Sequence, residues 1–391
     1  MKLLDLKQKT VEEAAALLGV DPKSAALERF LAIGLPTKKS EEYRYFQIEK
    51  LFEKEYHRLS YVPHPIEEAE KIVITDGMVT HAPKGMRIYY EQCQAMDMEH
   101  FDPLYYLGHL LAPHVIKIDL DGDADVEIEH RYTQSGALIN YRIVLLNQVN
   151  RHSTIFESFH AEDISDTLVL YGYDIFVAPD STLRMIKNQH MHDNRYAMVA
   201  SHHFKLNQRA NAVVKSFDMG EDMGLQLIKA ELDRYAHMDA GHLLYLNNKA
   251  QRGTVSKIIH QGEHATSHQE AKNILDGHSR GIFDALIKVE HSAKYTKAHQ
   301  NSKAILLDER AYMAAKPQLE IYIDELEASH GSTTGQLDPK QLFYLRSRGI
   351  SEVEARKMLV IAFANTLIEQ VKDHRHQEII KQTFDEAFYK N

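Results

Sequence analysis

The stretch VIKIDLDGDADVEIE, residues 115–129, is where the sequence takes on the pattern that decides the fold. Apolar and charged residues alternate from residue 115 to residue 120, an Asp-Gly pair follows at 121–122, and the alternation resumes at residues 126–129. A period of two is typical of a β-strand with one face in a core and the other in water, and Asp-Gly is a turn signal. The stretch therefore predicts two consecutive strands.

Similar strand-like runs continue to about residue 323, with turn signals between many of them. More than ten short strands without an intervening amphipathic helix exclude a doubly wound α/β domain and leave a sandwich, a barrel or a β-solenoid. Periodicity alone does not choose among these three. The further strands are expected at residues 138–146, 168–177, 183–187, 203–206, 213–217, 225–232, 242–246, 255–259, 283–289 and 319–323.

The residues before this β-rich part predict helices. A capping box at residues 10–13 precedes an apolar run that ends at Gly19. Asp21-Pro22 offers an N-cap with proline at the first helical position, so a second helix is expected to begin there and to end at Gly34. Residues 70–115 are mixed, with a short strand expected at 72–74 and a helix at 101–111.

The end of the chain is predicted to be helical again. Asp338-Pro339 marks the start of a short helix that ends at Gly349, and a capping box at residues 351–354 begins a longer one. Apolar residues at intervals of four indicate a last helix around residues 380–388. The predicted organisation is a helical region with a mixed linker over residues 1–114, a β core over 115–334 and a helical domain over 335–391.

Composition excludes several classes of protein. With 391 residues, 44% of them hydrophobic, the chain can bury a large core. A net charge of -10 argues against an electrostatic nucleic-acid binder. The sequence has no apolar run of 18 residues, so no membrane span is expected. Charged residues interrupt the first 13 positions where a signal peptide would need an apolar segment, so we expect a cytoplasmic location.

Cys93 is the only cysteine, which limits the metal chemistry. Iron–sulfur clusters are held mainly by thiolates, and this chain cannot supply a set of them. We interpret Cys93 as a small buried hydrophobic residue. The sequence also has no Gly-x-x-x-x-Gly-Lys-Ser/Thr phosphate loop and no Gly-x-Ser-x-Gly elbow, so neither ATP binding by that route nor hydrolase chemistry of that type is predicted.

Five segments resemble, in the same order, motifs of the SufB/SufD family of iron–sulfur cluster assembly proteins. Tyr43 stands where the family usually has tryptophan, and the resemblance is dense from residue 241 to residue 363 but loose from 50 to 170. The FYLRSRGI portion is similar to the SufD branch, because the SufB branch tends to read Phe-Tyr-Cys there. The segments are GLPTKKSEEYRY (34–45), HSRGIF (278–283), KAHQNS (297–302), KPQLEIY (316–322) and GQLDPKQLFYLRSRGI (335–350).

The resemblance implies a mainly β fold, with a right-handed parallel β-helix core between N-terminal and C-terminal helical regions. It also implies a scaffold subunit without catalysis of its own, which pairs with a SufB-like paralogue and docks a SufC-like ABC ATPase. In isolation such a chain could form a homodimer through the same surface. No cofactor is expected to stay bound to the chain alone. A transient iron–sulfur cluster would be shared with the SufB-like partner.

Site residues follow from the same resemblance. His330 matches a family histidine at the SufB–SufD interface, for which a role in holding the nascent cluster beside a SufB cysteine is implied, although Ala328 stands where the family usually has a cysteine. The alternative to a cluster-holding role for His330 is that of a turn or hydrogen-bonding residue. The implied SufC-docking region could equally be packing within the domain and solvated charge; its residues are Leu342, Phe343, Tyr344, Arg346 and Arg348.

Other histidines suggest metal sites less strongly. His260, His264 and His268 would share one face only on a helix, whereas this stretch predicts a strand and then a break at Gly262. Solvated histidine is the commoner explanation there, and also for the pairs His190/His192, His202/His203 and His374/His376. The competing function is a β-helical metal- or carbohydrate-active enzyme. Such an enzyme would carry clustered carboxylates in an open groove.

Overall fold

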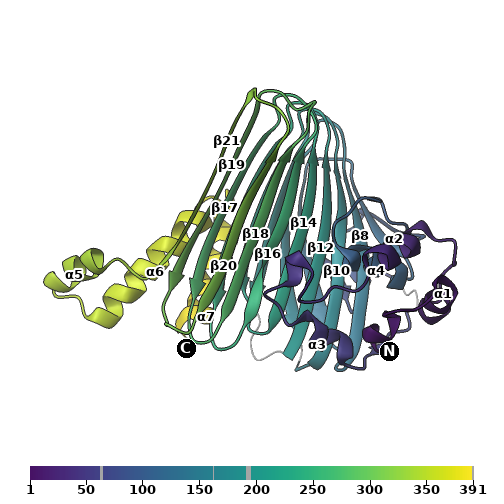
Figure 1. The fold of residues 1–391 in the computed structure, drawn as a ribbon, viewed down its shortest axis with the longest axis horizontal. Helices are drawn as coiled ribbons and strands as arrows, with labels where there is room; N and C mark the ends of the chain where they lie inside the picture. Colours follow the sequence, from purple (N-terminus) through teal and green to yellow (C-terminus); the bar gives the residue numbers. More distant parts are fainter. Residues whose placement is uncertain (62–64, 162, 191–194, 390–391) are drawn as a thin grey trace.

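The computed structural model describes residues 1–61, 65–161, 163–190 and 195–389. Its central part is a parallel β-solenoid of about seven turns, with helices at both ends of the chain (Figure 1). This confirms the mainly β fold and the solenoid, which the sequence pattern had left open. From β6 onward, each coil contributes one strand to each of two facing sheets, so that even-numbered strands stack in one sheet and odd-numbered strands in the other.

The first sheet, here the β6–β20 sheet, is parallel except at its antiparallel β5–β6 edge. A short strand, β1 (His57–Arg58), pairs beside β8. Its strands are β5 (Arg87–Glu91), β6 (Val115–Leu120), β8 (Ala137–Asn147), β10 (Ser165–Val177), β12 (Arg195–Leu206), β14 (Met223–Leu232), β16 (Gln251–His260), β18 (Arg280–Val289) and β20 (Tyr312–Ile321).

The second sheet, here the β7–β21 sheet, begins with an antiparallel β3–β4 hairpin and is parallel from β3 onward. Its strands are β2 (Glu67–Glu68), β3 (Ile72–Thr75), β4 (Met78–Ala82), β7 (Ala124–Tyr132), β9 (His152–Ala161), β11 (Thr182–His190), β13 (Asn211–Met219), β15 (His237–Leu246), β17 (Thr266–Leu275), β19 (Thr296–Leu306) and β21 (Leu326–Gly335).

The period-two pattern has its expected physical meaning. Ile116, Ile118 and Leu120 of β6 are buried in the central core between the sheets, while Lys117 and Asp119 are only half-buried.

Strands β9, β17, β19 and β21 were missed by the sequence analysis. In β17 and β19 the buried row contains small or polar residues, so no hydrophobic alternation is visible in the sequence.

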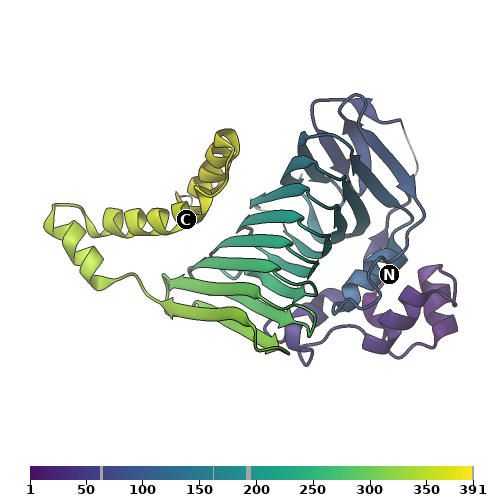
Figure 2. The same ribbon diagram turned by 90° about the horizontal axis from the view of Figure 1, so that it is seen from above.

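The N-terminal helices and α4 cover the outer face of the β6–β20 sheet, where their apolar sides pack against outward-facing residues of β8, β10, β12 and β14 (Figure 2). The expected capping box is present, with Thr10 and Glu13 bonded to each other's backbone, and Gly19 ends the helix with a positive φ. The elements are η1 (Leu3–Leu6), α1 (Val11–Leu18), α2 (Ala25–Ile33), η2 (Glu41–Tyr43), α3 (Ile48–Glu53) and α4 (Pro103–Leu111).

The predicted start of the second helix was wrong. The helix begins at Ala25, after an extended Ser24. Asp21 instead forms a turn, in which its side chain accepts from the Lys23 N–H and its carbonyl from the Ser24 N–H. Aspartate followed by proline suits a turn as well as a helix N-terminus. The helix forms only where the buried residues beginning at Ala26 contact the rest of the protein.

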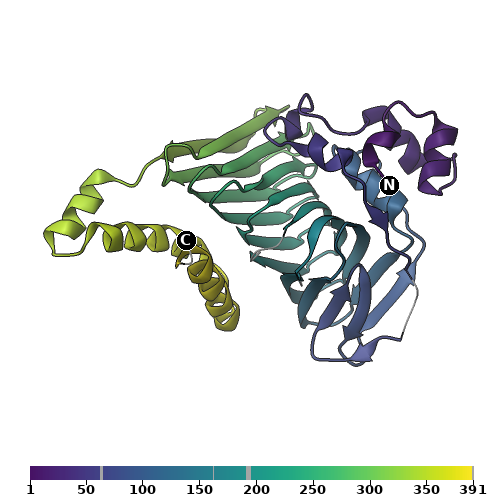
Figure 3. The ribbon, with the colours of Figure 1, turned by 90° about the horizontal axis from the view of Figure 1, so that it is seen from below.

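The C-terminal helices α5 (Pro339–Ser347), α6 (Glu352–Ile368) and α7 (His374–Tyr389) follow β21. Helices α6 and α7 pack on the outer face of the β7–β21 sheet, with Leu367 and Phe384 among their buried residues. Helix α5 has no buried residue along its fully described length and lies on an arm that extends away from the sheets (Figure 3). Asp338 caps α5 as the sequence indicated.

Two glycines test how closely the coils stack. A Cβ added at Gly253 of β16 would lie 2.1 Å from the Ile282 carbonyl oxygen, whereas one added at Gly335 would meet nothing within 4 Å. We expect Gly253→Ala to lower the free energy of unfolding by about 1–3 kcal/mol, because overpacking forces backbone shifts. Gly335→Ala should stay within about 0.5 kcal/mol of the parent chain. Urea denaturation of both variants measures the difference, and equal stabilities would contradict it.

Candidate functional site

His330 lies on β21, the last strand of the β7–β21 sheet. It stands in register opposite Gln300, which stands opposite Gln269, and the row continues back through Ala240 in the central core. Both glutamines are buried, whereas His330 is exposed. His330 therefore belongs to an inward-facing row and is accessible because no further coil follows in the described part of the chain.

The two final strands, β20 and β21, form what we call the open end of the solenoid. No described strand pairs with the outer edge of either one. Apolar side chains accompany these edges: Ile321 is 42% exposed and Tyr322 47%, and Leu326 and Ala328 are partly buried. Unpaired strand edges are ready to pair with another chain, and natural proteins usually protect them. The open end is thus a candidate protein-binding surface.

The five predicted docking residues lie on α5 and at its C-cap, and their surroundings differ. Leu342 is partly buried against the core shared with α6 and α7. Phe343 and Tyr344 are 74% and 57% exposed. Arg346 pairs with a glutamate of α6 at 3.2 Å, and the Arg348 guanidinium lies over the Tyr344 ring. An exposed phenylalanine and tyrosine on a projecting helix are characteristic of a contact surface.

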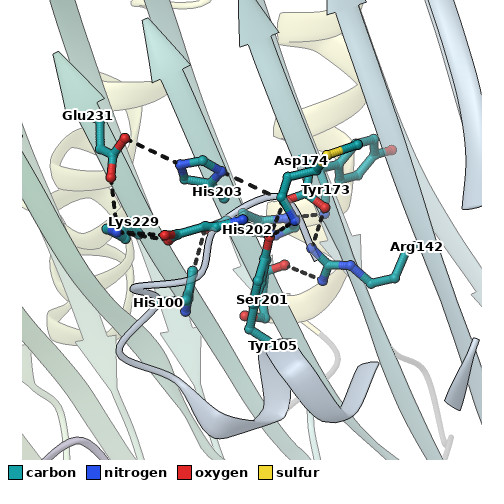
Figure 4. Close-up of polar contacts among 12 residues, drawn as sticks. His100, Tyr105, Arg142, Tyr173, Asp174, Ser201, His202, His203, Lys229 and Glu231 are labelled. Atoms are coloured by element: carbon teal, nitrogen blue, oxygen red, sulfur yellow. Dashed lines mark hydrogen bonds and ion pairs between the residues drawn. The ribbon is translucent and has the colours of Figure 1, made fainter. Parts of the chain in front are cut away.

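A buried charged network lies beneath α4 and the residues just before it, and the sequence analysis missed this network. Asp174 of β10 is its centre (Figure 4). The Tyr105 hydroxyl donates to Asp174 Oδ1 at 2.5 Å, and Arg142 Nη2 donates to Oδ2 at 3.3 Å. His109 Nε2 lies 3.2 Å from Oδ2, and His203 Nδ1 lies 3.7 Å from Oδ1. Tyr105 and His109 come from α4, so the network joins this helix to the outer face of the β6–β20 sheet.

The network continues through His203 of β12 to β14. The donor atoms of Asp97, His203 and Glu231 lie within 4.8 Å of one another, an arrangement that could hold a metal ion. The Lys229 ammonium, however, contacts Asp97 Oδ2 at 2.8 Å and Glu231 Oε1 at 2.9 Å. Since this ammonium already supplies the positive charge between the two carboxylates, we interpret the group as an internal ion-pair network and not as a metal site.

Protonation states follow from these contacts. Burial lowers the pKa of His203, but the Asp174 and Glu231 carboxylates outweigh burial and raise this pKa to about 9. Burial likewise acts to raise the pKa of Asp174, yet Arg142 and His109 hold it well below its usual range. At neutral pH His203 is therefore a cation between two carboxylates.

The three histidines after β16 have separate surroundings. His260 is buried, and its Nε2 lies 2.8 Å from the Ser267 hydroxyl. His264 is exposed and stacks between two tyrosine rings, with centroids 4.9 Å away on each side. His268 lies 3.3 Å from an aspartate on β15. They belong to no described group of metal-ligating side chains.

The two members of a histidine pair also have different surroundings. His202 points into the core, where its ring contacts Tyr171 and Tyr173, while the adjacent His203 points outward into the charged network. His376 stacks on an aromatic ring of β9, and His374 is exposed. His192 of the pair His190/His192 lies outside the described residues.

Cys93 corrects another expectation, because it is only partly buried. Its Sγ lies 3.4 Å from His109 Nδ1.

The sequence contained one signal for the buried charged network, namely charged residues within apolar strands, such as Asp174 and Lys229. A charge in that position requires a partner when it is buried. The sequence did not say which residue the partner was.

Comparison with known proteins places the chain in a family. The family model for the SUF system FeS cluster assembly SufBD core domain matches residues 130–363. The chain belongs to the SufBD family. A second model, the SufBD protein N-terminal region, matches residues 1–72. The family is a component of iron–sulfur cluster assembly, so this SufBD protein has a role in the Suf system.

Curated relatives point the same way. The iron–sulfur cluster assembly protein SufD of Escherichia coli (strain K12) is 26% identical over 381 residues, which are 89% of this chain and 88% of that protein. A SufBD family protein of Mycobacterium bovis is 27% identical over 267 residues, 68% of this chain and 59% of its own length. A SufBD family protein of Synechocystis is 30% identical over 129 residues, 33% of this chain and 28% of its own length. The chain is thus SufD-like within its family.

Among the described residues, no helix is both long enough and apolar enough to cross a membrane.

The charged network predicts a pH dependence of stability. His203 has a folded pKa of about 9, above its unfolded value of about 6.5, so its stabilisation is complete below about pH 6.5 and is lost as the pH rises toward 9. Between pH 6.5 and 8 we expect the free energy of unfolding to fall by about 1–2 kcal/mol from this group. Urea denaturation across that interval measures it.

The matched variants are His203→Gln and His264→Gln. The first should flatten the decrease because it removes the titrating cation. The second replaces an exposed histidine outside the network and should keep the decrease. A His203→Gln protein with the same pH dependence as the parent chain would show that His203 is not the titrating group.

Proposed function

We propose that this protein is a non-catalytic, cytoplasmic scaffold subunit of an iron–sulfur cluster assembly complex of the SufBCD type. It pairs with a SufB-like paralogue, docks a SufC-like ATPase and contributes His330 to a cluster shared with the paralogue. Membership of the SufBD family supports the general role. The observation that carries the specific proposal is the open end, with its unpaired edges and an inward-row histidine.

The open end favours a partner built like this chain. Its two parallel edge strands present a register of backbone groups that another parallel solenoid can match. A paralogue of the same fold supplies such strands, and a partner seated there would cover Ile321, Tyr322 and His330 together. Without a partner, a second copy of this chain could occupy the same surface, which would give the homodimer.

His330 suits a shared site because an imidazole nitrogen can replace thiolate on iron in some clusters. The only cysteine in the chain, Cys93, contacts α4 beneath the N-terminal segment and cannot serve the open end. The partner must therefore supply the sulfur ligands. Ala328, two residues before His330 on the same strand face, adds no donor atom.

Helix α5 supports the docking of a separate ATPase subunit. It projects on an arm beyond the sheets (Figure 2), and Phe343 and Tyr344 are its most exposed aromatic residues. Arg346 and Arg348 place positive charge beside them. An aromatic pair flanked by arginines has the composition of a binding hot spot.

A tagged copy of this chain, co-expressed with the SufB-like and SufC-like proteins of the same cell, should purify with both. Isolation of the chain alone would oppose the proposal.

Replacement of the open-end histidine tests the donor role. His330→Ala should leave folding and co-purification intact, because the side chain is exposed. The iron and sulfide content of the anaerobically purified complex should fall severalfold. His299→Ala is the matched control, since His299 is also exposed and lies on the neighbouring strand β19. Equal cluster content in the two variants would remove the donor role.

Replacement of the aromatic pair tests the docking role of α5. Phe343→Ala combined with Tyr344→Ala should weaken binding of the SufC-like protein by about 30-fold or more, because hot-spot truncations cost about 2 kcal/mol. Calorimetric titration measures the dissociation constant. Tyr295→Ala removes a tyrosine that is 52% exposed at a corner of the solenoid and should leave binding unchanged. Similar affinities for both variants would place the docking surface elsewhere.

A further inference from the structure

A cavity of about 830 Å³ lies where the N-terminal helices meet the solenoid. Its wall is formed by the end of α1, the start of α2, β1, the segment after β5, the end of α4 and β8. Cys93 and His109 are among the side chains with metal-binding chemistry at this wall. The family assignment gives no role to this cavity, and it is separate from the open end.

The thiol and the imidazole face each other. Cys93 Sγ lies 3.4 Å from Nδ1 of His109, which is in the last turn of α4. The contact brings together a sulfur and a nitrogen atom, the two donor types that zinc prefers, and each binds a metal ion in its deprotonated form.

Asp174 determines which imidazole nitrogen faces the thiol. Its Oδ2 lies 3.2 Å from His109 Nε2, an ion-pair distance without hydrogen-bond geometry, and this negative charge favours a ring proton on Nε2, which leaves the lone pair of Nδ1 for Cys93. A carboxylate behind a histidine is the usual outer support of a metal-ligating imidazole, because it fixes the ring and raises its basicity. Arg142 pairs with the same carboxylate, so their charges offset and leave little net repulsion of a cation.

We propose that Cys93 and His109 bind a divalent transition-metal ion of the zinc or ferrous class at the wall of this cavity, with Asp174 as a positioning residue. Ordinary zinc–sulfur and zinc–nitrogen bonds at a tetrahedral angle place the two donor atoms about 3.6 Å apart, close to their separation here. Metal binding displaces the thiol proton and replaces the S–H···Nδ1 contact.

The cavity supplies the remaining coordination positions. Asn140 lies on the same wall and is buried, and its Oδ1 has no hydrogen-bond partner among the described residues, while its amide donates to the Gly108 carbonyl. An unpartnered buried oxygen is costly unless it receives a donor or a cation. Cys93 and His109 are one protein ligand fewer than an ordinary open zinc site has, so water within the cavity would have to complete the coordination. The proposal does not rest on the proposed assembly role.

Cobalt titration of the full-length chain tests the site. Since Cys93 is the only thiol, thiolate-to-cobalt charge-transfer absorption can come from no other residue. We expect this absorption to saturate at one Co²⁺ per chain and to disappear on addition of Zn²⁺. Cys93→Ser and His109→Gln should abolish it while the circular dichroism stays unchanged. Glutamine at 109 keeps an N–H group for Asp174, and His264→Gln, which alters an exposed histidine, should behave as the parent chain.

A second readout separates binding from folding. Zn²⁺ should slow alkylation of Cys93 by iodoacetamide in the parent chain and not in His109→Gln.

Asp174→Asn, if it folds, should keep the charge-transfer absorption and weaken Co²⁺ binding by about 10–100-fold, as expected of a residue that orients a ligand. Folded parent protein without the absorption at millimolar Co²⁺, or His109→Gln protein with parental affinity, would overturn the proposal. These measurements use the isolated chain, so failure of the assembly role would not affect them.

Discussion

Each coil of the solenoid buries its inward row only against the coils on either side, and this constraint governs the rest of the molecule. The row that runs from Ala240 through Gln269 and Gln300 to His330 shows the consequence. Every member is buried until the coils stop, and the last one is exposed. At the other end, the antiparallel β5 edge and the β3–β4 hairpin depart from the parallel pattern before the solenoid begins. The asymmetry between the two ends is why the proposed partner surface lies at β20 and β21.

The outer faces of the two sheets are covered by helical segments through different kinds of contact. The β7–β21 sheet is covered by α6 and α7 through apolar contacts, with a few polar bonds such as Lys215 to Gln370. The β6–β20 sheet combines apolar contacts with the buried network around Asp174. Buried ion pairs add little net stability, but each one is costly to break because a charge is then left without a partner. The N-terminal segment is therefore held in one position, and that position places Cys93 beside His109.

Sequence reasoning succeeded where the physical cause was local. The capping box at Thr10, the Asp338 cap and the alternation at residues 115–120 depend on neighbours within a few positions, and the structure contains all three. It failed where a local signal was ambiguous, as at Asp21, or where the buried row is polar, as in β19. The choice of a solenoid over a sandwich or barrel came from resemblance to a family. Periodicity describes one strand and does not say which strand is its neighbour.

The sequence by itself determined the strands with apolar inner rows, the helical ends, the single thiol and membership of the SufBD family, because these depend on residue order. Only the tertiary structure decided which distant side chains meet. Lys229 reaches Asp97 across 132 positions of sequence, and Tyr105 reaches Asp174 across 69. Such contacts are set by how the covering segment packs on the sheet. No pattern of neighbouring residues records that packing, so the charged network and the thiol–imidazole pair become visible only in three dimensions.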